Sequence, residues 1–182
     1  LASLPGATVT QVKIDGVQHE FSTLAGMNED VITLLLNLKR VRFELHGDEA
    51  MTVTLKKSGA GMVTAADIVC PTQVQVLNPA QHIAELTAKT SNLDMEIRIE
   101  RGLGYVPREI HQRDKVEIGT IALDAVFTPI RRANYEVENM RVGDRTDYNR
   151  LRLSIETDGT ITPRAALEKS IEIMIHQLKA VI

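Results

Sequence analysis

Residues 162–182 read TPRAALEKSIEIMIHQLKAVI and predict a helix at the end of the chain. Thr162 can accept the N-cap hydrogen bond, and Pro163 then occupies the first helical position, where its missing N–H costs nothing. After this start, apolar residues recur at steps of four, three, four and three, which is a narrow, heptad-like seam. The seam consists of Leu167, Ile171, Met174, Leu178 and Val181. Such a helix either docks on its own domain or also packs against a partner chain, and the two interpretations are compatible.

The composition is that of an ordinary globular protein. The length of 182 residues is enough for one domain or two small ones. Hydrophobic residues make up 43% of the chain and charged residues 25%. A net charge of -3 provides no basic field for nucleic acid, and an aromatic content of 3% without Trp leaves few stacking platforms for bases. The single Cys70 cannot form an internal disulfide and fits a reducing compartment, so we expect a cytoplasmic protein. No apolar run approaches the roughly 20 residues of a membrane-spanning helix.

The beginning of the chain predicts a β-hairpin. Residues 9–14 and 17–21 carry apolar side chains among polar ones, on either side of the turn signal Asp15-Gly16. His19 and Glu20 are neighbours on the second predicted strand, and neighbouring side chains of a strand point to opposite faces. They are therefore not expected to act together in catalysis, and the hairpin has a structural interpretation.

A short helix and a second hairpin are predicted next. Asn28 is expected to cap the helix, which carries a dense apolar stripe and ends near Arg40. Residues 41–45 and 51–55 alternate around a Gly-Asp turn signal, which predicts two strands paired with each other.

The second half of the chain predicts longer strands. Residues 93–101 place apolar side chains on one face and charged ones on the other, as in a half-solvated antiparallel strand. The polar residues 108–117 predict a surface loop. Two further strands, over residues 132–142 and 151–157, are expected to be joined through residues 144–150.

A search for catalytic patterns finds none that fits. In the glycine-containing segment 57–67, KSGAGMVTAAD, the Lys and Ser precede the glycines, which is the wrong order for a phosphate-binding loop. The histidines lack HExxH spacing, and no GxSxG elbow is present. Asp144 and Asp147 are the closest acidic pair, but Arg145 lies between them, and solvated loop charges are the simpler interpretation. We therefore expect no catalytic residue, no metal and no cofactor.

Six segments occur in a characteristic order and spacing: IDGVQHEFST (14–23), LLLNLK (34–39), KSGAGMVTAAD (57–67), GYVP (104–107), DRTD (144–147) and TDGTI (157–161). Together they resemble the N-terminal assembly domain of the bacterial RNA polymerase α subunit family, over essentially all of the chain. The resemblance implies an α+β fold in two domains. A mostly antiparallel β domain, residues 6–129, is inserted into an α/β dimerisation domain, residues 1–5 and 130–182, which ends in the long C-terminal helix.

The resemblance also implies a function. Members of the family are non-catalytic subunits of DNA-directed RNA polymerase, the nucleotidyltransferase complex of transcription, in which two α copies pair and recruit the β and β′ subunits. The terminal helix resembles half of the family's dimer interface. By position, the residues that match the β-contacting and β′-contacting surfaces are His19, Glu20, Ser22, Arg145 and Asp147.

Two departures from the family pattern give further expectations. The family's first strands and first long helix lie before the position of Leu1, and a separate C-terminal DNA-binding domain lies beyond the position of Ile182. We therefore expect a fragment that forms only a weakened homodimer and does not bind DNA directly.

Two other classes of function stay open as alternatives. A scaffold subunit of an unrelated complex would capture partners other than large polymerase subunits. A small-molecule enzyme would use Asp124, Asp144 or Asp147 and would bind a metal or ligand beside them.

Overall fold

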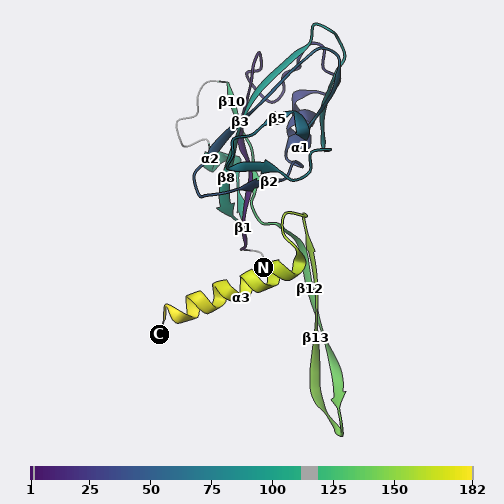
Figure 1. The fold of residues 1–182 in the computed structure, drawn as a ribbon, viewed down its shortest axis with the longest axis vertical. Coiled ribbons are helices and arrows are strands. Elements are labelled where there is room, and N and C mark those ends of the chain that lie inside the picture. The colour runs from purple at the N-terminus through teal and green to yellow at the C-terminus, as the bar shows by residue number, and fades with distance from the viewer. Residues whose placement is uncertain (2, 112–118, 182) are drawn as a thin grey trace. The chain divides into compact units, whose positions relative to one another are not determined.

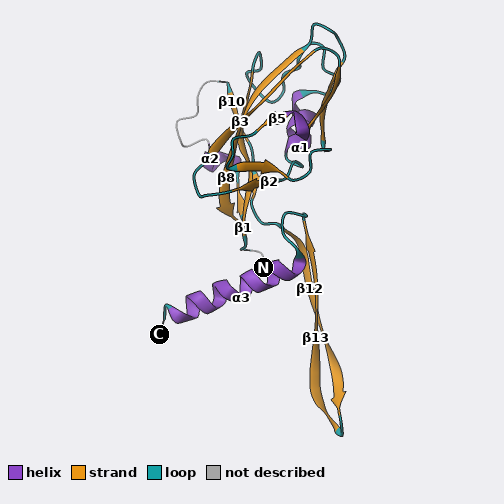
Figure 2. Ribbon diagram, in the orientation of Figure 1, coloured by secondary structure: helices purple, strands orange, loops and turns teal. Residues whose placement is uncertain are grey.

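The computed structural model describes residues 1, 3–111 and 119–181. The predicted α+β class is confirmed, because the paired strands are antiparallel and the last element is a helix (Figure 2). The elements follow in the order β1 (Pro5–Ile14), α1 (Val31–Leu38), β2 (Phe43–Leu45), β3 (Met51–Ser58), β4 (Gly61–Thr64), the 3-10 helix η1 (Ala65–Asp67), β5 (Ile68–Val69), β6 (Val74–Val76), β7 (His82–Leu86), β8 (Asn92–Leu103), β9 (Tyr105–Val106), α2 (Arg108–His111), β10 (Thr120–Ala122), β11 (Ala125–Val126), β12 (Ile130–Val142), β13 (Arg145–Thr157) and α3 (Pro163–Lys179) (Figure 1).

The chain divides into two compact units. We call Pro5–Phe127 the insert unit, and Leu1–Leu4 together with Thr128–Ile182 the terminal unit. The boundary on the C-terminal side falls next to Pro129, whose fixed backbone and missing N–H do not suit the interior of a continuous strand.

The insert unit is built on a five-stranded sheet with the order β10-β1-β8-β3-β5. Strand β8 lies at its centre, and the predicted alternation along it is confirmed. Leu93, Met95, Ile97 and Ile99 are all buried, whereas the side chains between them face outward. The opposite faces of this strand therefore separate a hydrophobic core from a charged surface.

Helix α1 packs into the same core through one apolar face. Its buried residues are Val31, Leu34, Leu35 and Leu38. The predicted cap residue is wrong, because Asp30 and not Asn28 caps the helix. The Asp30 side chain accepts a hydrogen bond from the backbone N–H of Thr33 at 2.8 Å, and the helix begins two residues later than the sequence suggested.

Both hairpins predicted for the insert unit are wrong in their pairing. Strand β1 pairs with β8 and β10, and residues 17–21 form no strand. Strand β2 pairs with β6, while β3 pairs with β8 and β5. The physical reason is that a strand's alternation determines which face is buried, whereas its partner depends on the whole sheet. A long strand such as β8 offers more ladder hydrogen bonds to β1 and β3 than their short neighbours in sequence can.

The terminal unit contains one long hairpin of β12 and β13 (Figure 1). The predicted connection through residues 144–150 is wrong, because most of this segment belongs to β13. The chain reverses at Gly143, whose φ of 61° suits glycine. The charged residues that suggested a loop are accommodated in the strand because the hairpin is exposed to water.

The two faces of this hairpin differ in chemistry. Residues directly opposite each other share a face, so Tyr135, Val137, Leu151 and Leu153 form one apolar face, and all four side chains are exposed. The other face carries cross-strand ion pairs: Arg132 contacts Glu156 at 3.0 Å, and Arg152 contacts Glu138 at 3.1 Å.

Helix α3 begins as the sequence predicted. The Thr162 side chain accepts a hydrogen bond from the N–H of Ala165 at 3.2 Å, and Pro163 occupies the first turn. Ala166 and Ser170 are buried, and the helix contacts β13. Beyond Ser170 the helix is exposed to its end, so only its first part is packed within the unit.

Candidate interaction surfaces

The predicted contact residues His19, Glu20 and Ser22 lie together in one turn, which we call the 19–22 turn. The backbone N–H of Ser22 donates to the carbonyl oxygen of His19 at 3.1 Å, and Ser22 Oγ lies 3.3 Å from His19 Nδ1. These two bonds close the turn locally. The turn follows β1 because Gly16, with φ 78°, redirects the chain after the strand.

The 19–22 turn forms one wall of an apolar groove of about 230 Å³. The groove is lined by Glu20, Phe21, Ile32, Leu35, Leu36, Lys39, Arg108, Ile121, Ala122, Leu123 and Asp124. Helix α1 supplies the exposed Ile32 and Leu36 and the buried Leu35, and β10 supplies Ile121 and Ala122. Two of the lining residues form an ion pair, in which Arg108 Nη1 lies 3.1 Å from Glu20 Oε1. A partner with apolar side chains would find a preformed concave surface here.

Phe21 is a candidate contact residue that sequence reasoning missed. Its side chain is 74% exposed, and its ring centroid lies 6.5 Å from that of His19. An exposed aromatic side chain in a turn is a typical anchor of protein interfaces. A signal was present, since the phenylalanine is one of few aromatic residues in the chain. The mistaken strand assignment hid it, because a strand would have buried Phe21 on one face.

The start of α1 is tied to the neighbouring strand β7. Glu29 Oε2 accepts a hydrogen bond from the backbone N–H of Glu85 at 2.8 Å, and Glu29 Oε1 lies 2.7 Å from His82 Nε2. Burial opposes ionisation of the Glu29 carboxyl, but these hydrogen-bond partners outweigh it and lower its pKa. The Glu29 carboxylate therefore holds the N-terminal end of α1, the helix that lines the groove.

Arg145 and Asp147 lie near the tip of the β12–β13 hairpin. Arg145 contacts both carboxylate oxygens of Asp147, at 3.1 and 2.6 Å, and its guanidinium lies 5.1 Å from the ring centroid of Tyr148. The hydrogen bond from Arg145 lowers the pKa of Asp147. These groups are exposed, so they form a compact charged and aromatic surface at the hairpin tip.

The predicted seam of α3 is exposed along most of its length. Leu167 is half-buried, while Ile171, Met174, Leu178 and Val181 are exposed. Leu178 is 66% exposed to solvent. Contiguous apolar side chains on a helix face are unusual on a surface that stays in water.

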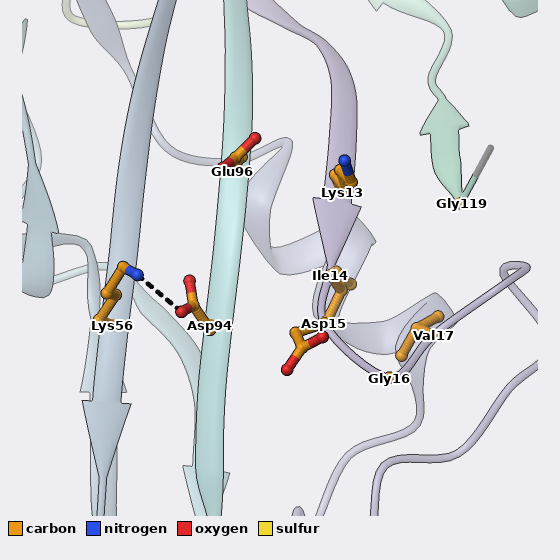
Figure 3. A pocket seen from close by; sticks show the side chains of 9 residues that line it. All are labelled: Lys13, Ile14, Asp15, Gly16, Val17, Lys56, Asp94, Glu96 and Gly119. Carbon is orange, nitrogen blue, oxygen red and sulfur yellow. Dashed lines mark ion pairs between the residues drawn. The ribbon is translucent and has the colours of Figure 1, made fainter. Parts of the chain in front are cut away.

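The structure also contains a polar pocket of about 340 Å³ in the insert unit (Figure 3). Its charged lining residues are Lys13, Asp15, Lys56, Asp94 and Glu96, and the dashed line in Figure 3 joins Lys56 Nζ to Asp94 at 2.8 Å. Asp94 raises the pKa of Lys56. Within the described ranges, no group of three or more His, Cys, Asp or Glu side chains is arranged to hold a metal ion.

The aspartates considered for enzymatic chemistry have partners within the chain. Asp124 accepts a hydrogen bond from the backbone N–H of Arg108 at 3.0 Å, and Asp144 lies 3.7 Å from Arg141. Asp147 is held by Arg145. Among the helices that the structure describes, none is both long enough and apolar enough to cross a membrane.

Comparison with known families identifies the insert unit. The family model of the RNA polymerase Rpb3/RpoA insert domain matches residues 12–128. The chain belongs to this family. The expected resemblance to bacterial polymerase α subunits is thereby confirmed, and the match ends at the boundary between the two units.

Similar proteins extend the likeness over the terminal unit. The chain is 45% identical over 176 residues to the DNA-directed RNA polymerase subunit alpha of Roseiflexus castenholzii, covering 97% of this chain and 54% of the relative. It is 45% identical over 179 residues to the protein of the same name from Carboxydothermus hydrogenoformans, covering 98% and 57%. The subunit alpha of Alkaliphilus oremlandii is 45% identical over 178 residues, covering 98% and 56%. The chain thus spans about half the length of these relatives.

Proposed function

We propose that the chain is a non-catalytic assembly subunit of DNA-directed RNA polymerase, which pairs with a second copy and holds the β and β′ subunits. The observation that carries the proposal is the apolar surface left exposed in the terminal unit. One face of the β12–β13 hairpin and the outer part of α3 carry apolar side chains that the other described residues of the terminal unit leave exposed. A two-stranded hairpin is marginally stable by itself, so such surfaces favour a chain that is completed by other polypeptides.

The seam of α3 is proposed as the dimer surface. Its residues repeat with the spacing of a coiled-coil seam, and in a symmetric pair the same residues contact each other from both copies. The first part of the helix is packed within its own unit through Ala166 and Ser170, and its Arg164–Glu168 ion pair, at 2.9 Å, is exposed to solvent. The outer part, with Met174 and Leu178, is suited to a partner helix.

The 19–22 turn is proposed as the β-contacting surface, with Phe21 added to His19, Glu20 and Ser22. The turn combines an exposed aromatic ring with polar groups that are already held in place, which suits an interface anchor and its polar rim. The hairpin tip, with Arg145 and Asp147, is proposed as the β′-contacting surface. The Arg145 guanidinium there contacts Asp147 and the ring of Tyr148, so the tip presents charged and aromatic groups together to a partner.

Reconstitution tests the proposal. The chain would be mixed with the β and β′ subunits of a relative such as Roseiflexus castenholzii, with and without fusion to the segment that precedes the matched region in the α subunit of that organism. We expect a stable complex with the fused protein and a weaker one with the chain alone. Capture of neither large subunit by the fused protein would refute the assignment.

Point variants then assign the surfaces. Phe21→Ser should weaken capture of β, and Arg145→Ala should weaken capture of β′. Val69→Ser is the matched control for Phe21→Ser, because Val69 is also a strongly exposed apolar side chain of the insert unit. An equal loss with the control would mean that the effect is not specific to the 19–22 turn.

A further inference from the structure

Arg108 joins three separate parts of the insert unit. It begins α2, where its backbone N–H donates to Asp124 Oδ1 at 3.0 Å and so attaches the residue to the segment between β10 and β11. Its guanidinium extends to the 19–22 turn, where Nη1 lies 3.1 Å from Glu20 Oε1. A weaker contact, 3.9 Å long, links its Nε to the neighbouring Glu109.

This contact links the 19–22 turn to α2. The bonds between His19 and Ser22 close the turn but do not connect it to another element. In the part of the chain that the structure describes, Glu20–Arg108 is the ion pair that ties the turn to a distant segment. Phe21, the residue after Glu20 in the turn, is mostly exposed, so its packing restrains the turn only partly.

We propose that Arg108 is a positioning residue for the contact between the 19–22 turn and the large subunit, an inference that rests on the proposed function. The guanidinium holds Glu20 in the lining of the groove and thereby keeps Phe21 and the polar side chains of the turn in one arrangement. A turn ordered before association loses less conformational entropy on binding than a mobile one. Arg108 acts through Glu20 and need not touch the partner.

The expected size of the effect follows from exposure. The side chains of Arg108 and Glu20 are 49% and 30% exposed, so their attraction is screened by water. Loss of the pair should weaken binding of the large subunit by roughly two- to five-fold, the factor that corresponds to an exposed ion pair of good geometry.

A double-mutant cycle tests the inference. Wild type, Arg108→Ala, Glu20→Ala and the double variant would be compared for binding to the β subunit of Roseiflexus castenholzii, each fused to the preceding segment used for reconstitution. We expect Arg108→Ala to weaken binding in the wild-type background and to add no further loss in the Glu20→Ala background. Arg108→Lys, which keeps the charge, should recover part of the affinity. Independent, multiplying losses would show direct contact of Arg108 with the partner and would overturn the positioning role.

A second measurement does not require the partner. Hydrogen exchange of the Ser22 amide, which donates within the turn, should accelerate by about the same factor of two to five in Arg108→Ala. Arg98→Ala is the matched control, because the Arg98–Glu100 pair in β8 has exposures of 49% and 24% but lies away from the turn in sequence. Unchanged exchange in Arg108→Ala, or equal acceleration in the control, would refute the inference.

Failure of the two proposals can be told apart. If the wild-type fusion does not bind the β subunit, both the proposed function and this inference fall. If it binds and Arg108→Ala binds equally well, only the positioning role of Arg108 is refuted.

Discussion

Truncation of Leu178 to alanine is predicted to weaken self-association without destabilising the monomer. Leu178 lies in the outer part of α3 and is 66% exposed. Alanine keeps the helix, because it has the highest helix propensity. The substitution therefore removes apolar surface from the seam while leaving the secondary structure and the packed first part of the helix intact.

The magnitude follows from this exposure. Complete burial of a leucine side chain contributes about 1.5–3 kcal/mol, and the two thirds still exposed here leave about 1–2 kcal/mol to be gained in a dimer. A symmetric interface contains the residue twice, so the dimer should lose about 2–4 kcal/mol. At about 1.4 kcal/mol for each factor of ten, the dissociation constant should rise roughly 30- to 700-fold.

Sedimentation equilibrium over a wide concentration range would measure this change, for the chain and for its fusion to a relative's preceding segment. Leu36→Ala is the matched control, because Leu36 is a leucine of α1 with 55% exposure that lies outside the seam. We expect wild type and the control to associate alike. Dissociation constants of wild type and Leu178→Ala that agree within two-fold would refute the assignment of the seam. A lower melting temperature of the Leu178→Ala monomer would show instead that Leu178 packs within its own unit.

Three further predictions test the folded units. Gly102→Ala should destabilise the insert unit by about 1–3 kcal/mol in urea denaturation, because an added Cβ would lie 2.8 Å from the ring of Phe127. Adding Phe127→Leu to the Gly102→Ala variant should remove part of that cost. Thr162→Ala should cost about 1 kcal/mol of stability in the terminal unit through loss of the cap of α3, as followed by circular dichroism, whereas Thr162→Ser should be nearly neutral. The lowered pKa of Glu29 means that its contribution to stability is present above the pKa of an unfolded glutamate and is lost as pH falls through the folded value. The melting temperature should therefore fall more steeply in wild type than in Glu29→Gln between about pH 5 and pH 3, and parallel curves would contradict the role of this carboxylate.

Much of the secondary structure could be predicted because its signals are local. The start of α3 follows from Thr162 and Pro163, whose side chains act within one turn. The buried face of β8 follows from strict alternation along a single strand. Such features depend on residues that are close in sequence, and the structure confirms them.

Strand partners could not be predicted in the same way. Val12 pairs with Ile97 of β8 and with Ile121 of β10, residues far away in the chain. Nothing in the alternation of β1 distinguishes these partners from the adjacent segment 17–21, which the Asp15-Gly16 turn signal predicts as its hairpin partner. The error had a functional consequence, because the segment assigned to a strand contains the exposed 19–22 turn.

The contribution of Arg108 was hidden for a related reason. Residues 108–117 are polar and predict a surface loop, and this prediction does not indicate which charged side chain forms a contact. The contact with Glu20 becomes visible only when α2 and the 19–22 turn are placed together in three dimensions. The remainder of this segment, residues 112–118, lies outside the described residues.

The two faces of the β12–β13 hairpin differ in whether their side chains are paired within the chain. On one face, Arg152 and Glu138 neutralise each other across the strands, so this face has little need of another polypeptide. On the opposite face, Tyr135 and Leu153 form an exposed cross-strand pair. Their apolar surface stays in contact with water, which is unfavourable in free energy. The asymmetry argues that association is driven mainly by apolar burial, while the paired charges maintain the register of the strands that present it. Under the proposed function, a polypeptide that covers Tyr135 and Leu153 would therefore gain apolar burial without breaking the Arg152–Glu138 ion pair on the opposite face.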